Sequence, residues 1–183
     1  MNAYRLLVLT SSLFIVGAGA AQLTASPATT APIPKTTAPI TVTLTGLGCA
    51  TSLGADSFEA RSWSWGATMA GSATSGTGGG EGKAVISALT LSRVSDACSP
   101  DLLGGVVTGK HFPTFTLSQF DKDGVLKATV VLTDAILTSW QVGGSNTSAE
   151  AAEEVQLAFR KLTFTDVASG NKFSWDVAGS KAF

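Results

Sequence analysis

The sequence predicts a mainly β domain that forms an antiparallel barrel, with one short flanking helix and one long, extended glycine-rich loop. Most segments with hydrophobic patterning alternate apolar and polar residues, as strands with one buried face do. Short turn sequences such as Asp121-Lys-Asp-Gly124 separate several of them. Only one segment carries the start signals of a helix. Strands joined largely by short turns favour a closed or nearly closed barrel, because closure removes exposed sheet edges.

The first 39 residues carry features of export. Residues 1–20 combine a short basic start, an apolar run over 6–16 and the small residues 18–20, which predict a cleavable signal peptide. A membrane-anchoring helix is the alternative, but the run is shorter than the ~20 residues that a span needs. Residues 21–39 hold four of the six prolines and predict an extended linker. The domain then occupies residues 40–183 of a periplasmic or extracellular protein with no stable membrane span after cleavage.

The first part of the domain is predicted as three strands interrupted by an excursion. Residues 40–45 alternate apolar and hydroxyl side chains, and Gly46-Leu-Gly48 turns this strand. Residues 58–66 form a second alternating segment that directs Trp63 and Trp65 to the same face. Gly, Ser, Thr and Ala dominate the next residues up to Gly82, and regular patterning resumes over residues 83–94.

The helix is predicted to begin at Ser99-Pro100-Asp101, because serine caps a helix, proline suits its first position and an acid suits its first turn. Its apolar stripe and its end are expected at Leu102, Leu103, Val106, Val107 and Gly109. Strands are expected over residues 112–120, 125–140 and 172–177.

Residues 149–162 give conflicting signals. They are rich in helix formers, and Val155, Phe159 and Leu162 have helical spacing. Val155, Leu157 and Phe159 also alternate as a strand, and Leu162-Thr-Phe164 continues the alternation after a one-residue slip that a bulge can absorb. The residues alone leave both alternatives open.

The chain has two cysteines, Cys49 and Cys98, both in the mature part. Export permits a disulfide between them; two buried thiols and a bridge between subunits are the alternatives. The formal net charge is −1 and the basic residues are scattered, which argues against nucleic-acid binding.

No motif for catalysis or for a cofactor is present. The glycine run lacks the residues of a phosphate-binding loop, since Thr77 and Ala84 stand where Gly and Ser or Thr are needed. His111 is the single histidine and lacks companions at metal-ligand spacing, so we expect a strand-edge histidine. Glu150, Glu153 and Glu154 are expected on a solvated face. We therefore predict no catalytic, metal or cofactor site, with a hydrolase through His111 as a minor hypothesis.

From about Ile40 onward, the sequence resembles the hemolysin-coregulated proteins (Hcp), which form the tube of bacterial type VI secretion systems. The resemblance rests on an ordered set of segments, not on one motif. The segments are Ser62-Trp-Ser-Trp-Gly66, the loop ending in Gly82-Lys83, Leu89-Thr-Leu91, Ala97-Cys-Ser-Pro-Asp-Leu-Leu103, Thr108-Gly-Lys-His111, Leu132-Thr-Asp134, Ser139, Val155-Gln-Leu-Ala-Phe159 and Phe173-Ser-Trp-Asp176.

The resemblance implies a non-enzymatic subunit that assembles into hexameric rings, which stack into a tube whose lumen holds small effector proteins. It also favours strand over helix from about Val155. The matching loop of this chain is expected to contact a neighbouring subunit. The candidate contact residues are Met69, Ser72, Thr74, Ser75, Thr77, Glu81 and Lys83. Tube-building members lack a cleavable export signal, so residues 1–39 depart from the pattern. The alternative function is a monomeric exported barrel that binds an envelope or cell-surface partner through this loop.

Overall fold

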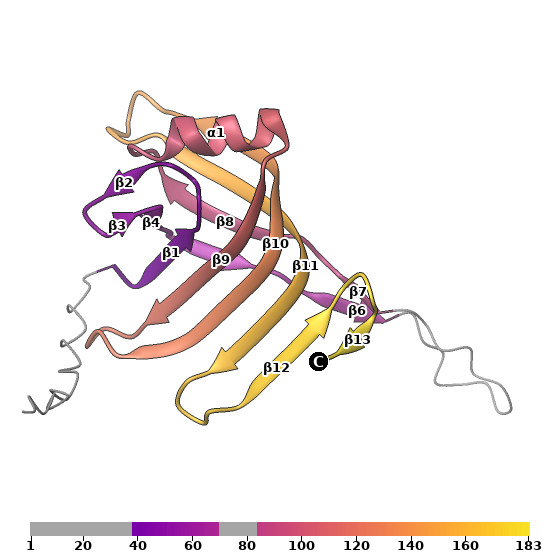
Figure 1. The fold of residues 1–183 in the computed structure, drawn as a ribbon. Helices are drawn as coiled ribbons and strands as arrows, with labels where there is room; N and C mark the ends of the chain where they lie inside the picture. Colours follow the sequence, from indigo (N-terminus) through magenta and orange to yellow (C-terminus); the bar gives the residue numbers. More distant parts are fainter. Residues whose placement is uncertain (1–37, 70–83) are drawn as a thin grey trace, which may run out of the picture. The chain divides into compact units, whose positions relative to one another are not determined.

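The computed structural model describes residues 38–69 and 84–183, so the expected signal peptide and most of the linker lie outside the described residues. Strands dominate these ranges, with one helix (Figure 1). The elements are β1 (Ile40–Leu44), β2 (Ala50–Thr51), β3 (Gly54–Ala55), β4 (Ser57–Glu59), β5 (Ser62–Ser64), β6 (Ala67–Met69), β7 (Ala84–Ile86), β8 (Leu89–Val94), α1 (Ser99–Thr108), β9 (His111–Phe120), β10 (Leu126–Gly143), β11 (Ala152–Asp166), β12 (Lys172–Asp176) and β13 (Lys181–Ala182).

The strands form an antiparallel barrel through a continuous series of pairings. β1 pairs with β9, β9 with β10, β10 with β11, β11 with β8 and β8 with β5. The chain from β4 to β5 joins the two ends of this series, because β4 pairs with β1. At the junction, the amide of Ala60 donates to the Ile40 carbonyl and that of Arg61 to the Ser92 carbonyl. β12 extends the other half of β11, beside the part that β8 covers.

Three neighbouring strands bend at the same level of the sheet. Asp134 of β10 has a left-handed backbone, with φ of 52°, and it is skipped in the pairing to both β9 and β11. Pro113 and Arg160 are the residues skipped opposite it. The inward-facing residues change parity there, with Leu132 and then Ala135 buried in β10. The pairing keeps its register across this level, because one residue is skipped on each strand. The register between β10 and β11 shifts further along, between Leu137 and Ser139.

The helix α1 lies across one end of the barrel (Figure 1) and packs against β10. A Cβ at Gly105 would lie 2.8 Å from Leu137 Cδ1 and 3.0 Å from Phe112 Cζ, so glycine permits this close approach. The start of the helix differs from the expectation. Cys98 is the N-cap without a side-chain cap bond, and Ser99 Oγ instead accepts a bond from the amide of Asp96.

The expected apolar stripe of α1 is only partly buried. Leu102 is fully buried, whereas Leu103 is 41% exposed and Val107 is 72% exposed. The outer two apolar residues face away from the sheet because the short helix touches the barrel along one narrow line. The end of the helix is as predicted, with Gly109 in the left-handed region at φ of 61°.

Residues 152–166 form a strand, which confirms what the family resemblance implies from about Val155. β11 is paired along its length, with β10 on one edge and with β8 and β12 on the other. The predicted one-residue slip is present, since the buried residues change from Leu157 to Leu162 across the bend at Arg160. Tertiary pairing therefore overrides the helix propensity of this segment.

Several short elements differ from the predicted ones. The segment 58–66 is not one alternating strand, because Phe58, Ala60, Trp63 and Trp65 all face the core. The parity changes at Arg61, where the chain passes from β1 to β8. The segment 83–94 is divided into β7 and β8, and the small strands β2, β3 and β13 were not predicted.

Candidate assembly surface and disulfide-linked cluster

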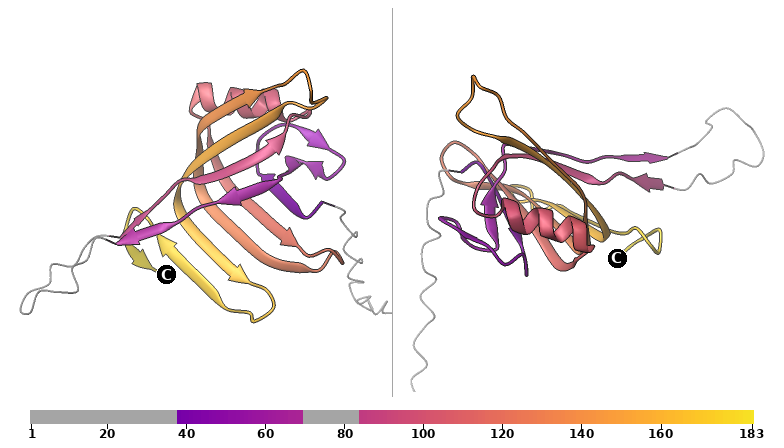
Figure 2. Two further views of the ribbon diagram at one scale, coloured as in Figure 1. Left: turned by 180° about the vertical axis from the view of Figure 1, so that it is seen from behind. Right: turned by 90° about the horizontal axis from the view of Figure 1, so that it is seen from above.

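A short two-stranded stalk, which we define as β6 and β7, projects from the barrel (Figure 2). The strands pair from Ala67 with Ile86 to Met69 with Ala84. Below them, the amide of Gly66 donates to Ser87 Oγ, at 2.8 Å. Two large apolar side chains on the stalk face solvent, with Met69 66% exposed and Val85 61% exposed. Exposed apolar side chains on a projecting pair of strands are suited to contact with another protein surface.

Of the seven residues predicted for a subunit contact, only Met69 lies in the described ranges. Ser72, Thr74, Ser75, Thr77, Glu81 and Lys83 lie outside the described residues. Val85 was not among the residues predicted for the subunit contact. Its position two residues after Lys83, which was predicted, could have indicated it.

Trp63 of β5 and Trp65, which lies between β5 and β6, anchor the base of the stalk. Trp63 Nε1 donates to Gln119 Oε1 of β9 at 3.0 Å. The ring of Trp65 lies 6.4 Å from that of Phe164 of β11, in a tilted arrangement. Both tryptophans are half-buried against the core, so they serve as barrel residues that fix the point where the stalk departs.

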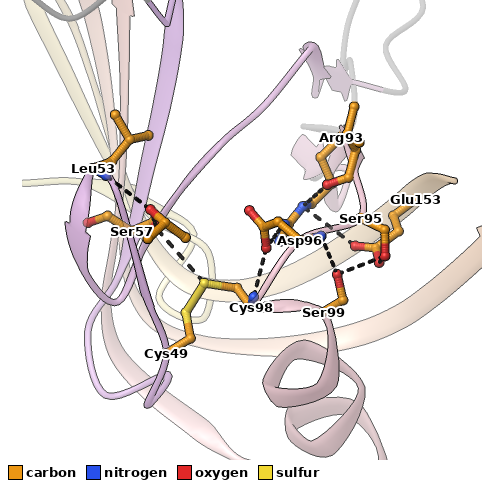
Figure 3. Close-up of polar contacts among 11 residues, drawn as sticks. Cys49, Leu53, Ser57, Arg93, Ser95, Asp96, Cys98, Ser99 and Glu153 are labelled. Carbon is orange, nitrogen blue, oxygen red and sulfur yellow. Dashed lines mark hydrogen bonds and ion pairs between the residues drawn. A yellow bond between two sulfur atoms is a disulfide. The ribbon is translucent and has the colours of Figure 1, made fainter. Parts of the chain in front are cut away.

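The structure joins Cys49 to Cys98 by a disulfide, with the two Cα atoms 5.1 Å apart (Figure 3). The bond ties the segment after β1 to the residue that caps α1. Cys98 has no exposed surface and Cys49 is 8% exposed. A disulfide with this little exposure is poorly accessible to a reducing thiol, which is typical of a structural bond.

The Gly-x-Gly turn before Cys49 holds a carboxylate through its backbone. The amides of Gly46 and Gly48 donate to the two carboxylate oxygens of Asp56, at 2.8 and 2.7 Å. These bonds, first that from Gly48 and then that from Gly46, lower the pKa of Asp56, and the nearby Lys110 charge lowers it further. Both glycines have positive φ, 86° and 106°, which the turn requires.

Beside the disulfide lies a buried charged cluster, which we define as Arg93, Ser95, Asp96, Ser99 and Glu153 (Figure 3). Arg93 of β8 and Glu153 of β11 are cross-strand partners with fully buried side chains, and Arg93 Nε lies 3.5 Å from Glu153 Oε2. Arg93 also pairs with Asp96, and Ser95 Oγ donates to Glu153 Oε1 at 2.7 Å.

The guanidinium of Arg93 also covers a ring of the core, since its Cζ lies 4.4 Å from the ring centre of Phe58. The cluster therefore joins two strands to the start of the helix at one end of the barrel. The expectation that Glu153 lies on a solvated face was wrong, because its residue is 2% exposed. Glu153 follows the inward parity of Val155 and Leu157, which the sequence pattern displayed.

His111 is the first residue of β9, as expected, and it is 66% exposed at the side chain. Its Nδ1 lies 2.8 Å from Asp134 Oδ1 of β10. Asp134 was not predicted as a partner of His111. The sequence contained one indication of its special position, because the apolar alternation of this strand changes parity at Asp134. Among the described residues, no serine, threonine or cysteine side chain bonds to this pair. The geometry therefore supplies two members of a Ser-His-Asp site without a nucleophile.

The described parts of the chain contain no group of three or more His, Cys, Asp or Glu residues arranged to hold a metal ion. Nor does any helix within residues 38–69 and 84–183 have the length and hydropathy of a membrane span.

Comparison with known proteins gives one family and many similar folds. A family model described as type VI secretion system effector, Hcp, matches residues 45–165. Hcp1 from Salmonella typhimurium is similar at 22% identity and a TM-score of 0.66, over 79% of this chain and 97% of that one. A type VI secretion system effector from Yersinia pestis is similar at 24% identity and a TM-score of 0.62, over 75% and 99%. The comparison with curated protein sequences finds no match.

Proposed function

Because the chain belongs to the Hcp family of type VI secretion proteins, whose members are structural tube subunits, we propose that its exported mature form assembles into hexameric rings that stack. The single observation that carries the proposal is the stalk, with Met69 and Val85 exposed at 66% and 61% on a hairpin that projects from the barrel. The subunit is proposed to be non-enzymatic, and the tube lumen to hold small effector proteins.

The proposed contact joins unlike surfaces of neighbouring copies. A stalk that contacted the stalk of a second copy would close a two-fold dimer, so a ring of six requires a head-to-tail contact between the stalk and a different surface. Contacts of that kind close into rings when the rotation between copies divides a full turn, and otherwise give open filaments. Burial of the two exposed side chains would favour association through the hydrophobic effect.

Export is proposed from residues 1–20 and gives the assembly an extracytoplasmic location. The buried disulfide supports this proposal, because disulfides persist mainly in oxidising compartments. Rings of this chain would then form after translocation of single subunits, with the linker 21–39 preceding each barrel.

The test compares stalk variants of the mature protein, from Ala21 onward, by sedimentation velocity. Met69→Ser with Val85→Ser should shift the protein toward the monomer while its unfolding midpoint is unchanged. Val125→Ser is the matched control, since Val125 is an apolar residue 53% exposed in the turn before β10. A protein that is monomeric with or without these substitutions would contradict the assembly and favour the monomeric binding module.

A further inference from the structure

A shallow pocket opens on the outer face of the sheet, at the level where β9, β10 and β11 bend. It has a volume of about 280 Å³ and is lined by His111, Asp134, Ile136, Ala158, Phe159, Arg160, Val177 and Ala178. Ile136 lies at its centre, because it is the direct cross-strand neighbour of His111 on one side and of Ala158 on the other. None of the residues that line this pocket belongs to the stalk.

The rim of the pocket carries one cation without a partner. The guanidinium of Arg160 forms no ion pair or hydrogen bond with any residue in the described ranges, although its backbone carbonyl accepts a bond from the amide of Val177. The pKa of Asp176 is lowered mainly by the backbone bond from Gly179, and then by the charges of Lys161 and Arg160. The carboxylate nearest to the pocket, Asp134, is already bonded to His111.

The bond between His111 and Asp134 fixes the imidazole at the opposite side of the pocket. Nδ1 faces Asp134, so Nε2 is the ring nitrogen left for another molecule. Asp134 keeps a positive φ of 52° in the middle of a strand, where a residue other than glycine is strained. Strained residues concentrate where a site requires a particular side-chain position.

We propose that this pocket binds a small aliphatic carboxylate. Its carboxylate would pair with the Arg160 guanidinium and accept a second bond from His111 when Nε2 carries a proton. The aliphatic body would lie on Ile136, Ala158 and Val177. The size of the pocket agrees with a small ligand, because drug-sized molecules occupy volumes of about 300–1,000 Å³. A guanidinium provides two parallel donors that match the two oxygens of a carboxylate.

The probe is 4-methylpentanoate, and its matched control is 4-methylpentanamide, which has the same aliphatic body without the charge. Saturation-transfer NMR of the mature protein measures binding whether the protein is monomeric or assembled. The acid should bind about tenfold more tightly than the amide at low salt, since charged hydrogen bonds exceed neutral ones. The difference should shrink as salt is added, because the guanidinium of Arg160 is exposed.

The variants assign the effect to this pocket. Arg160→Gln should weaken binding of the acid to the level of the amide, and Arg160→Lys should retain part of the difference because it retains the charge. Arg61→Gln is the control, since Arg61 is an exposed arginine paired with Glu150 elsewhere on the barrel. Equal binding of acid and amide to the unsubstituted protein would overturn the proposal. So would full retention of the difference in Arg160→Gln.

Discussion

Cys49 and Cys98 are joined by a disulfide that closes a separation of 49 residues and fastens the first turn of α1 to the segment after β1. Cross-linking residues this far apart removes much of the conformational freedom of the unfolded chain. For a loop of this length, the chain-entropy model gives about 4 kcal/mol of stabilisation.

Replacing both cysteines by alanine should therefore lower the free energy of unfolding by about 4 kcal/mol, measured by urea denaturation. Mass spectrometry of the exported protein without reductant should show one intramolecular disulfide. A double variant as stable as the unsubstituted protein would contradict this account of the bond.

Gly104 and Gly105 of α1 should respond oppositely to alanine. Gly104→Ala places its Cβ in open space, so the better helix propensity should raise the free energy of unfolding by up to ~1 kcal/mol. Gly105→Ala gains the same propensity, but its Cβ would crowd Leu137 and Phe112. The crowding should make it less stable than Gly104→Ala by about 1–3 kcal/mol. Thermal and urea unfolding measure the stabilities of the two variants. Equal stabilisation by both substitutions would contradict the close packing of α1 at Gly105.

Arg93 and Glu153 should be strongly coupled, because neither charge has access to solvent. Arg93→Met alone leaves Glu153 buried without its cation and should cost about 3–5 kcal/mol of unfolding free energy. Adding Glu153→Leu should recover part of this loss. Arg61→Gln breaks an exposed pair with Glu150 and serves as the control, with an expected cost of about 0–1 kcal/mol. Additive losses in a double-mutant cycle would show that the two buried side chains act independently.

Asp121 should make the stability depend on pH in the acid range. Its carboxylate accepts a bond from the amide of Val125 and pairs with Lys127, which lower its pKa from 3.8 to about 2. A carboxyl group with a depressed folded pKa contributes stability above its unfolded pKa, and this is lost as the pH falls through the folded pKa. Asp121→Asn should therefore be less stable than the unsubstituted protein above pH 3.8, and the two should converge toward pH 2.

The control for this prediction is Asp123→Asn, since Lys122, which is exposed, is the one partner of the Asp123 carboxylate among the described residues. Urea midpoints measured across the acid range give the comparison. A constant difference between Asp121→Asn and the unsubstituted protein down to pH 2 would contradict the assigned cause.

The sequence predicted the elements whose patterns are local. The strand at Ile40–Leu44, the turn at Gly124 and the end of α1 at Gly109 follow from alternation and from glycine at positive φ, both of which are readable in the residues. Residues 152–166 needed the family resemblance as well, because their helix propensity opposes their alternation. The division at Arg61 depends on which strands the chain pairs with, and nothing local specifies that.

The less predictable features depend on contacts between distant residues. Glu153 became a buried partner because its strand lies beside Arg93, 60 positions earlier in the sequence. The outward-facing Leu103 and Val107 were assigned to the core because spacing within a helix does not tell how wide its contact with the barrel is. The pocket at Arg160 requires the bends of three strands to fall at one level, which only their register establishes.

The most direct test of the central claim is negative-stain electron microscopy of the mature, oxidised protein, from Ala21 onward, at high concentration. We expect six-fold rings, or stacks of them, and their loss when Met69 and Val85 are replaced by serine. Particles of the size of one barrel, with no rings at any concentration, would contradict it.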